Sequence, residues 1–442
     1  MHRLVLSCAL MCYAGLASAT CGTDWASFIK DVKQEALAQG YPRPLVTRFF
    51  DGAAQDPKVI KADRRQGVFQ NDFISFSQAL ISEHRLVHAQ KNAGKYAATF
   101  DRVSRDYGIP PGVLLAFWAF ETDFGVNQGN FNTLNALLTL SHDCRRPELF
   151  RPQVFAALEL YKRGDFDPRE TQGAWAGEIG MIQMLPEDIL DSGTDGDGDG
   201  RVDLQNSVAD ALISGGHMLR RLGWQAGAPW LQEIDLPETL DLTLTGLDKS
   251  QTVARWQALG VTGRHGPLEP SAGQASVLLP VGHKGPAFLT YPNFNVYFEW
   301  NQSLVYVTTA AYFATLLSGE PRFYPGTPDT GLTGQEMQAL QQKLMARGHD
   351  VGRIDGILGS KTRAAVQAEQ DRLNLPADAW PTPQLLNRLS KISASRHCNT
   401  TGGQRRPGQA GAARSCHWAK CFGLALGYAE VFLKASCDTP RR

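Results

Sequence analysis

The sequence carries no excess of either charge, because 44 Lys and Arg residues balance 44 Asp and Glu residues. Proteins that bind nucleic acid or an anionic membrane surface usually show a basic patch or a high net charge. No nucleic-acid partner is therefore expected. Hydrophobic residues make up 43% of the 442 residues, which is enough for sizeable cores, and this length predicts two or three domains.

Long hydrophobic runs are scarce as well. A membrane-spanning helix needs about 20 apolar residues, and no stretch after the first residues is that long and apolar. The amino terminus instead has the pattern of a secretory signal, with an apolar run over 4–15 and small residues at 17–19. We expect a signal peptide over 1–19 and hence an exported protein. Lipid attachment at Cys21 is the less favoured alternative, because the preceding residues do not resemble a lipobox.

Cysteines are few, with 8 in the whole chain, and Cys8 and Cys12 would leave with the signal peptide. The other six show no zinc-binding spacing. In an exported chain an even number of cysteines permits disulfides. Within the main body we predict a disulfide between Cys21 and Cys144. The remaining cysteines lie from Cys398 onwards, and their connectivity stays open.

The most informative stretch is an apolar run that begins at Leu114 and ends in Glu121. Read as a helix, it places Glu121 one turn beyond Phe117 on an apolar wall. Desolvation there would raise the pKa of the carboxyl, and a carboxyl that keeps its proton near neutral pH can serve as a general acid. The alternative is a structural glutamate at a helix end, paired with an arginine such as Arg145. This stretch alone does not decide between them.

The rest of the chain is predicted to be mainly helical, with strand-like runs at Ile234–Leu242 and Ala275–Leu279. Residues 321–332 are rich in Pro, Gly and Thr and predict a linker. After it, Thr333 and Glu336 predict a capping box that opens a three-helix unit over 333–391. The Cys-rich tail over residues 392–442 has no assignable fold. Further helices are predicted at Leu134–Ser141, Val154–Lys162, Leu304–Leu317 and Thr382–Leu389.

An acidic loop resembles the first half of an EF-hand loop, in which carboxylates at positions 1, 3 and 5 and the carbonyl at position 7 bind calcium. The candidate ligands are Asp195, Asp197, Asp199 and the carbonyl of Arg201. Position 12, which should be a bidentate glutamate, is Asn206. We predict a weak, structural calcium site. The alternative is a solvated acidic turn before a helix that Ser207 and Asp210 cap.

Several motifs together resemble the lytic murein transglycosylase B family. They are Phe120–Gly125, Ser141–Arg146, Trp175–Pro186, Asp197–Arg201, Leu222–Trp224, Gly282–Leu289 and Trp300–Ser303. The resemblance covers residues 21–318 and keeps the family's order. Residues 333–391 separately resemble the three-helix peptidoglycan-binding domain, through Asp355–Thr362 and the pair Ala365 and Val366.

This resemblance implies a mainly α (α+β) fold: a lysozyme-like catalytic domain over 20–320 and a small three-helix peptidoglycan-binding domain. It implies a periplasmic, monomeric enzyme that acts on murein glycan strands, requires no cofactor and could meet wall-synthesis proteins. The family cleaves the β-1,4 bond between N-acetylmuramic acid and N-acetylglucosamine without water and leaves 1,6-anhydro ends. A single glutamate acts first as acid and then as base, and the carry-over places it at Glu121. Endo or exo action is not predicted.

The resemblance also implies the substrate-binding residues Gln183, Asn301 and Tyr306. Trp300 and His217 are further candidates: Trp300 could stack on a sugar, and His217, which sits within a helical face, could equally be structural. For Gln183 the alternative is a loop amide that bonds only to backbone. The family often has Ser at Ala174, Tyr at His217 and Tyr at Trp300, so this chain lacks a hydroxyl that could orient the catalytic carboxyl. In the small domain, Glu369 replaces a usual aromatic, and a charge at a core position destabilises the fold unless it reaches water. The alternative for the small domain is that it folds but binds glycan poorly and acts as a spacer.

Two other functions stay open. A hydrolytic muramidase needs a second carboxylate about 5–9.5 Å from the first. Asp123 points to another helix face, whereas Asp143 and Glu178 cannot be placed from sequence. A catalytically silent wall-binding or scaffold protein is the third candidate, and the intact Glu121 in its apolar helix argues against it.

Overall fold

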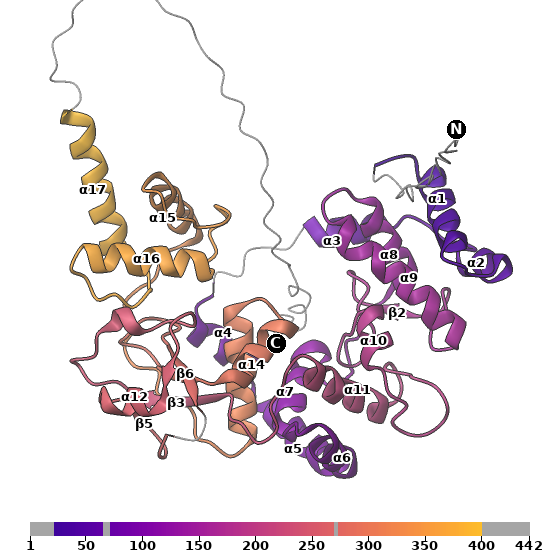
Figure 1. The fold of residues 1–442 in the computed structure, drawn as a ribbon, viewed down its shortest axis with the longest axis horizontal. Coiled ribbons are helices and arrows are strands. Elements are labelled where there is room, and N and C mark those ends of the chain that lie inside the picture. Colours follow the sequence, from indigo (N-terminus) through magenta and orange to yellow (C-terminus); the bar gives the residue numbers. More distant parts are fainter. Residues whose placement is uncertain (1–21, 65–70, 269–272, 400–442) are drawn as a thin grey trace, which may run out of the picture.

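The computed structural model describes residues 22–64, 71–268 and 273–399 (Figure 1). The predicted signal peptide over 1–19 and Cys21 lie outside these residues, as does the tail from residue 400 onwards. Among the described residues, no helix is both long enough and apolar enough to cross a membrane. The predicted mainly helical fold with a small sheet is confirmed.

The amino-terminal third is helical. It contains α1 (Trp25–Ala38), α2 (Arg43–Phe49), α3 (Pro57–Arg64), α4 (Phe73–Leu80), α5 (Glu83–Lys95) and α6 (Ala97–Tyr107). Asp24, Asp72 and Ser82 each accept a hydrogen bond from the backbone N–H three residues further on. These caps satisfy N–H groups that the first turn of a helix leaves unpaired, and they fix where α1, α4 and α5 begin.

Helix α7 (Pro111–Thr122) is the centre of the large domain. Its residues from Gly112 to Thr122 are all buried, as expected for a helix that is apolar on every side. It packs along α14 (Leu304–Leu317) and against α5, α6 and α11 (Val208–Arg221). A Cβ atom at Gly112 would lie 2.8 Å from the carbonyl oxygen of Ala314, so glycine permits this close packing. The last turn of α7, which carries Glu121, is therefore held in one position.

Between α7 and α11 the chain forms α8 (Thr133–His142), α9 (Pro147–Arg163) and α10 (Pro186–Ser192), which pack in that order. Short strands β1 (Phe131–Asn132) and β2 (Gln172–Gly173) pair in antiparallel register. The helices predicted at Leu134–Ser141 and Val154–Lys162 are present within α8 and α9.

A five-stranded antiparallel sheet follows, with the order β4-β6-β7-β3-β5. Its strands are β3 (Leu231–Asp235), β4 (Gln251–Thr252), β5 (Thr262–Gly263), β6 (Gln274–Leu278) and β7 (Phe288–Thr290). Helix α12 (Val253–Ala258) packs Trp256 into a separate core under this sheet. The strand prediction for Ile234–Leu242 is wrong beyond Asp235, because Pro237 accepts a turn hydrogen bond from Leu240 and the 3-10 helix Leu242–Leu244 follows.

The small domain consists of α15 (Gly334–Ala346), α16 (Ser360–Arg372) and α17 (Pro383–Asn399). Its core contains Met337, Leu340, Leu344, Val351, Ala365, Val366, Leu385 and Leu389. The predicted capping box is confirmed, since the side chains of Thr333 and Glu336 bond reciprocally to backbone N–H groups. The third helix is longer than the predicted Thr382–Leu389.

The small domain lies beside the sheet of the large domain (Figure 1). The amide of Gln367 donates to the carbonyl oxygens of Leu242 and Thr245 at 2.9 and 3.0 Å. Across the same contact, Nδ1 of His283 lies 2.6 Å from Oδ2 of Asp378. These contacts bury polar groups of both domains and fix their relative position.

The segment 321–332, predicted as a linker, is anchored to the large domain. Phe323 packs its ring 5.2 Å from that of Phe73 and 4.8 Å from that of Tyr312. The backbone N–H of Thr327 donates to the carbonyl oxygen of Lys284 at 2.9 Å. The Pro- and Gly-rich composition identified an extended connection but not the aromatic side chain that attaches it.

Candidate active site

Glu121 lies in the last turn of α7, directly before the helix ends. Asp123 adopts a left-handed conformation with φ 52° and closes the helix. Its carboxylate pairs with Arg85 at 3.0 Å and so leaves the face that Glu121 occupies. The hydroxyl of Thr122 donates to the carbonyl oxygen of Met181 at 2.5 Å. The helix end is thus tied to the Gly-rich segment that faces it.

The carboxyl of Glu121 is 9% exposed and accepts two hydrogen bonds at Oε1. The hydroxyl of Tyr306 donates at 2.5 Å and the indole N–H of Trp300 at 3.2 Å. Burial raises the pKa of Glu121 to about 7, the two donors oppose this shift, and the nearby charge of Glu178 adds to it. Near neutral pH a large fraction of Glu121 therefore retains its proton, as a general acid requires.

Trp300 ends α13 (Pro292–Trp300) and contacts both the acid and its helix. Its ring stacks on Phe117, one turn before Glu121, with 4.1 Å between ring centroids. Asn301 caps α13, and its side-chain oxygen accepts from the N–H of Ser303 at 2.8 Å. Trp300, which stands where the resembling family often has tyrosine, here donates to the candidate acid.

The Gly-rich segment forms tight turns opposite the end of α7. Gly177 has φ 93°, and a Cβ atom there would lie 2.2 Å from Cδ2 of Leu137. Gln183 has φ 56°, and its amide donates to the carbonyl oxygens of Gln128 and Gly180 at 3.1 and 2.7 Å. The amide is held by backbone groups, while its own oxygen has no hydrogen-bond partner in the described part of the chain.

Glu178, which could not be placed from sequence, lies in the same segment. Its Oε2 atom is buried, and burial raises the pKa of the carboxyl to about 7. The charge of Arg146 opposes this shift. Ala174, which lacks the hydroxyl often found at its position, donates its backbone N–H to the carbonyl oxygen of Glu178 at 2.9 Å.

A cavity of about 2020 Å³ connects these groups, which is large enough for several sugar rings. Besides Glu121 and Glu178, it is lined by four of the five predicted substrate-binding residues, namely Gln183, Trp300, Asn301 and Tyr306. Small-domain residues line its other end, among them Arg353, Ile357 and Lys361. The cavity therefore extends from the candidate acid to the small domain.

The fifth residue, His217, is not among the residues that line this cavity. Its ring stacks on Tyr107 with 5.4 Å between centroids, and its Nδ1 lies 3.0 Å from the carbonyl oxygen of Ser192. The helical pattern of the sequence did not show which face of the helix His217 occupies. Its contacts are those of a packing residue.

Arginines line the cavity close to Glu178. Arg146 pairs with Asp63 at 2.6 Å, and Arg145 pairs with Asp63 and Asp143. Among the described residues Glu121 forms no ion pair, so the structural alternative of a Glu121–Arg145 pair is not realised.

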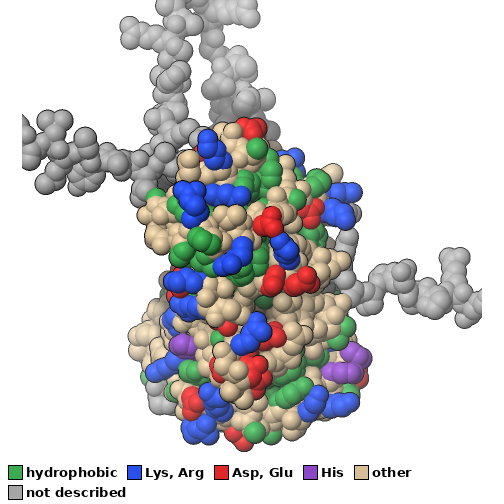
Figure 2. All heavy atoms as spheres, turned by 90° about the vertical axis from the view of Figure 1, so that its right-hand side faces the viewer, with side chains coloured by type: hydrophobic (Ala, Val, Ile, Leu, Met, Phe, Trp, Pro, Cys, Tyr) green, Lys and Arg blue, Asp and Glu red, His purple; other side chains and the backbone are tan. Residues whose placement is uncertain are grey.

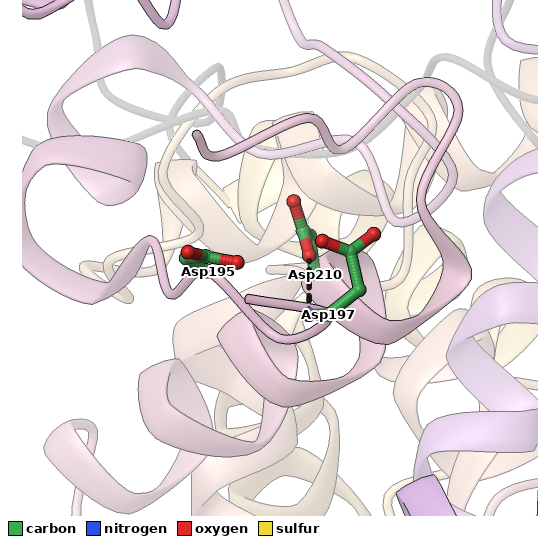
Figure 3. Close-up of side chains that lie close together, drawn as sticks. All are labelled: Asp195, Asp197 and Asp210. Atoms are coloured by element: carbon green, nitrogen blue, oxygen red, sulfur yellow. Dashed lines mark hydrogen bonds between the residues drawn. The ribbon is translucent and has the colours of Figure 1, made fainter. Parts of the chain in front are cut away.

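In the acidic loop, the carboxylates of Asp195 and Asp197 approach that of Asp210 (Figure 3). One oxygen from each lies within 4.8 Å of the others. Asp199 is not a member of this group, because its carboxylate accepts the N–H of Arg201 at 2.9 Å. The structure therefore brings together two of the predicted ligands and one that was not predicted.

Asp210 was expected to cap α11 together with Ser207. The hydroxyl of Ser207 does accept the N–H of Asp210 at 3.2 Å, but the carboxylate of Asp210 turns into the acidic loop. There it accepts N–H groups of Gly196 at 2.8 Å and Asp203 at 2.7 Å. Sequence spacing showed the cap, whereas the loop fold that surrounds Asp210 decides what its carboxylate binds.

Cys144 is disulfide-bonded. The backbone N–H of Gly22 donates to the carbonyl oxygen of His142 at 3.2 Å, so Gly22 lies close to Cys144. Cys21 lies outside the described residues, and its pairing with Cys144 stays a prediction.

On the face that Figure 2 shows, basic and acidic side chains alternate, and hydrophobic side chains form only small patches. This face carries no broad area of one charge. Specific contacts inside the cavity, rather than a general surface charge, are therefore the features that can select a ligand here.

Comparisons with known proteins match this architecture. Residues 24–315 match the model of the transglycosylase SLT domain, and residues 333–389 match a peptidoglycan binding domain. The chain is 26% identical to membrane-bound lytic murein transglycosylase B of Escherichia coli K12 over 288 residues, which are 63% of this chain and 75% of that protein.

Solved structures agree. SltB3 from Pseudomonas aeruginosa, in complex with NAG-anhNAM-pentapeptide, superposes with a TM-score of 0.77 at 36% identity, over 83% of this chain and 99% of that chain. SltB1 from the same organism shares the fold, with a TM-score of 0.58 at 22% identity over 66% of this chain and 98% of that chain. The predicted family and enzyme class, a peptidoglycan lytic transglycosylase, are thereby confirmed. The chain belongs to the transglycosylase SLT domain family and carries a peptidoglycan binding domain at its carboxyl side.

Proposed function

We propose that this enzyme cleaves the β-1,4 bond between N-acetylmuramic acid and N-acetylglucosamine without water and leaves 1,6-anhydro-N-acetylmuramic acid ends. The observation that carries the proposal is Glu121, a carboxyl with a pKa of about 7 in a cavity of about 2020 Å³. The SltB3 complex, whose ligand contains an anhydro sugar, supports the product class. The proposed location is the periplasm, where peptidoglycan lies.

In the first step, Glu121 donates its proton to the glycosidic oxygen as the bond to the anomeric carbon breaks. The substrate's own 2-acetamido group stabilises the positive charge at that carbon, so no second protein carboxylate is needed. Tyr306 and Trp300 both donate to Oε1 of Glu121. These donors stabilise the carboxylate that forms when the proton leaves.

In the second step, the Glu121 carboxylate removes the proton of the sugar's 6-hydroxyl, and that oxygen attacks the anomeric carbon. The 1,6-anhydro bridge closes, and Glu121 regains a proton from the 6-hydroxyl, while the proton that it gave away stays on the oxygen of the departing sugar. Tyr306 remains a donor throughout, because burial and the neighbouring carboxyl raise its pKa well above 10.

Mass spectrometry of the products from purified peptidoglycan tests this proposal. Anhydro ends are expected from the wild type. Reducing ends would instead identify a hydrolytic muramidase. Such an enzyme needs a second carboxyl, and Glu178 lies in the same cavity. An absence of new ends would leave a binding protein without activity. The variant Glu121→Gln removes the proposed acid. Its matched control is Glu170→Gln, which removes a carboxyl at an exposed position outside the cavity.

We further propose that the acidic loop binds Ca²⁺ as a structural ion. Asp195, Asp197 and Asp210 present the hard oxygen ligands that this ion prefers. Thermal unfolding with calcium and with a chelator tests the site, because a ligand held only by the folded state raises Tm. At about 100 times Kd the gain is about 2.7 kcal/mol, and Asp195→Asn should remove it. Equal Tm values in both buffers would contradict the proposal.

A further inference from the structure

The two-step mechanism does not use Glu178, although its carboxyl lines the same cavity as Glu121. Its Oε2 atom is buried and has no hydrogen-bond partner among the described residues. Buried carboxyl oxygens without a partner destabilise a fold and are uncommon in native proteins. The position of Glu178 beside the acid therefore calls for a functional explanation.

The backbone fixes where this carboxyl lies. Ile179 forms bridges with Gly173 and Met184 on either side of the turn. The backbone N–H groups of Ala176 and of Glu178 itself lower the pKa of the carboxyl, which places it close to its own turn. The turn that these bridges hold therefore keeps the carboxyl at the wall of the cavity.

The negative charge of Glu178 raises the pKa of both Glu121 and Arg146, so it favours the neutral form of Glu121 and the charged form of Arg146. Burial raises the pKa of both carboxyls to about 7. Two negative charges in one desolvated cavity disfavour each other, so such a pair retains one proton over a range of pH. The two carboxyls differ in their partners: the cation Arg146 favours the ionised form of Glu178, whereas the donors to Glu121 are the neutral groups of Tyr306 and Trp300.

Other charged or titratable groups face this pair and belong to the same balance. Around Glu121 they are Tyr306 and, next to Tyr306, Arg85 with its partner Asp123. Around Arg146 they are Asp63, Asp143, Glu148 and Arg353.

We propose that Glu178 is a positioning residue for the catalytic proton: together with Arg146 it carries the negative charge of the pair and keeps the proton on Glu121. This inference rests on the proposed role of Glu121 as the acid. Glu178 itself contacts no reacting atom in this scheme. Glu178 extends to higher pH the range over which Glu121 keeps its proton.

The pH profile of kcat/KM for anhydro-product release tests the inference with three variants. In Glu178→Gln the alkaline limb should move down by about half a pH unit, which gives about threefold lower activity at pH 8 and no change at pH 5. Glu178→Asp keeps the charge and should retain the wild-type limb. Glu170→Gln removes an exposed charge outside the cavity and should change nothing.

A merely structural role would lower activity equally at every pH. An alkaline limb shared by the wild type and Glu178→Gln would overturn the inference, as would identical limbs in Glu178→Gln and Glu178→Asp. Failure of the proposed function looks different, because the wild type itself would then release no anhydro product.

A second measurement serves if Glu178→Gln does not fold. Carboxyl ¹³C NMR of labelled glutamate can follow both carboxyls in the wild type, with Glu121→Gln used to assign the two signals. Glu178 should lose its proton at a lower pH than Glu121, because the pair gives up its protons in two steps and the first charge is proposed to lie on Glu178. The reverse order would contradict the inference.

Discussion

The cavity of the large domain and the core of the small domain each bury a glutamate, and their surroundings act on the proton in opposite ways. Glu121 is 9% exposed, and burial raises its pKa to about 7. Glu369 is 3% exposed, yet its pKa is lowered to about 2. Burial by itself raises the pKa of both carboxyls, so their hydrogen-bond and ion-pair partners account for the difference between the two pKa values.

Glu121 has neutral donors, whereas Glu369 has two arginines among its partners. Tyr306 and Trp300 bond to Glu121 without compensating its charge. Arg372, His349 and Arg347 surround Glu369 at 2.6, 3.0 and 3.2 Å. A buried carboxyl that keeps its proton can transfer it, and one that is fully paired stabilises a fold. The expectation that the charge of Glu369 must reach water is wrong, because the residue is buried and its carboxylate pairs with Arg347 and Arg372 instead.

The largest effect is expected from Glu121→Gln. A positioned general acid contributes about 10²–10⁴-fold to rate, so kcat for anhydro-product release should fall about 10³-fold. Binding to insoluble peptidoglycan should persist, because the small domain is untouched. Product release by mass spectrometry and a pull-down measure the two properties. Near wild-type turnover would remove Glu121 from the mechanism.

Glu369→Gln should show the opposite pattern. Removal of one partner leaves the half-buried Arg347 without its counter-charge, and the small domain should lose about 3 kcal/mol of stability at pH 7. Because the folded pKa of about 2 lies below the usual 4.5, this stabilisation exists above pH 4.5 and is lost as pH falls towards 2. Unfolding of the full chain at pH 7 and pH 3 measures it.

The matched control is Asp371→Asn, which removes an exposed charge from the same helix, α16. It should leave both stability and turnover unchanged. If Glu369→Gln instead lowers turnover on short soluble fragments as strongly as Glu121→Gln does, the distinction between a catalytic and a structural glutamate fails.

The two glutamates also differ in how far sequence could predict them. The apolar run before Glu121 predicted its burial directly, because a helix places one wall of Phe117 and Leu114 beneath it. The cations around Glu369 come from α16 itself and from the end of α15, and their convergence depends on how those helices pack. The residue type showed that burial of a charge at Glu369 is unfavourable, but it did not show which side chains compensate for that charge.

The same limit applies elsewhere. The capping box at Thr333 is local and was predicted correctly. The positions of Glu178, Asp210 and Phe323 depend on segments far away in the chain, and no local pattern shows them. Spacing along one element is readable from sequence, whereas contacts between elements require the fold.

Stability as a function of pH sharpens the comparison further. The folded pKa of Glu121 lies above its usual 4.5, so its contribution to stability is greatest below pH 4.5 and declines until pH passes about 7. Gln does not titrate. Glu121→Gln should therefore be more stable than the wild type at pH 8, by on the order of 2 kcal/mol, and equal to it near pH 4. Chemical unfolding at both pH values decides this, and a variant that is less stable at pH 8 would contradict the desolvated carboxyl.

The smallest effect is expected from Tyr306→Phe, which removes one neutral donor. The hydroxyl of Tyr306 lowers the pKa of Glu121, so its loss should move the alkaline limb of kcat/KM to higher pH by about half a pH unit and reduce kcat a few-fold. Glu178→Gln should move the same limb the other way. Phe313, which packs on Phe120 from the same helix α14 without touching Glu121, provides a control as Phe313→Leu, with an unmoved limb. If Tyr306→Phe and Glu178→Gln shift the limb in the same direction, neutral donors and a neighbouring charge do not act on Glu121 as separate, opposing influences.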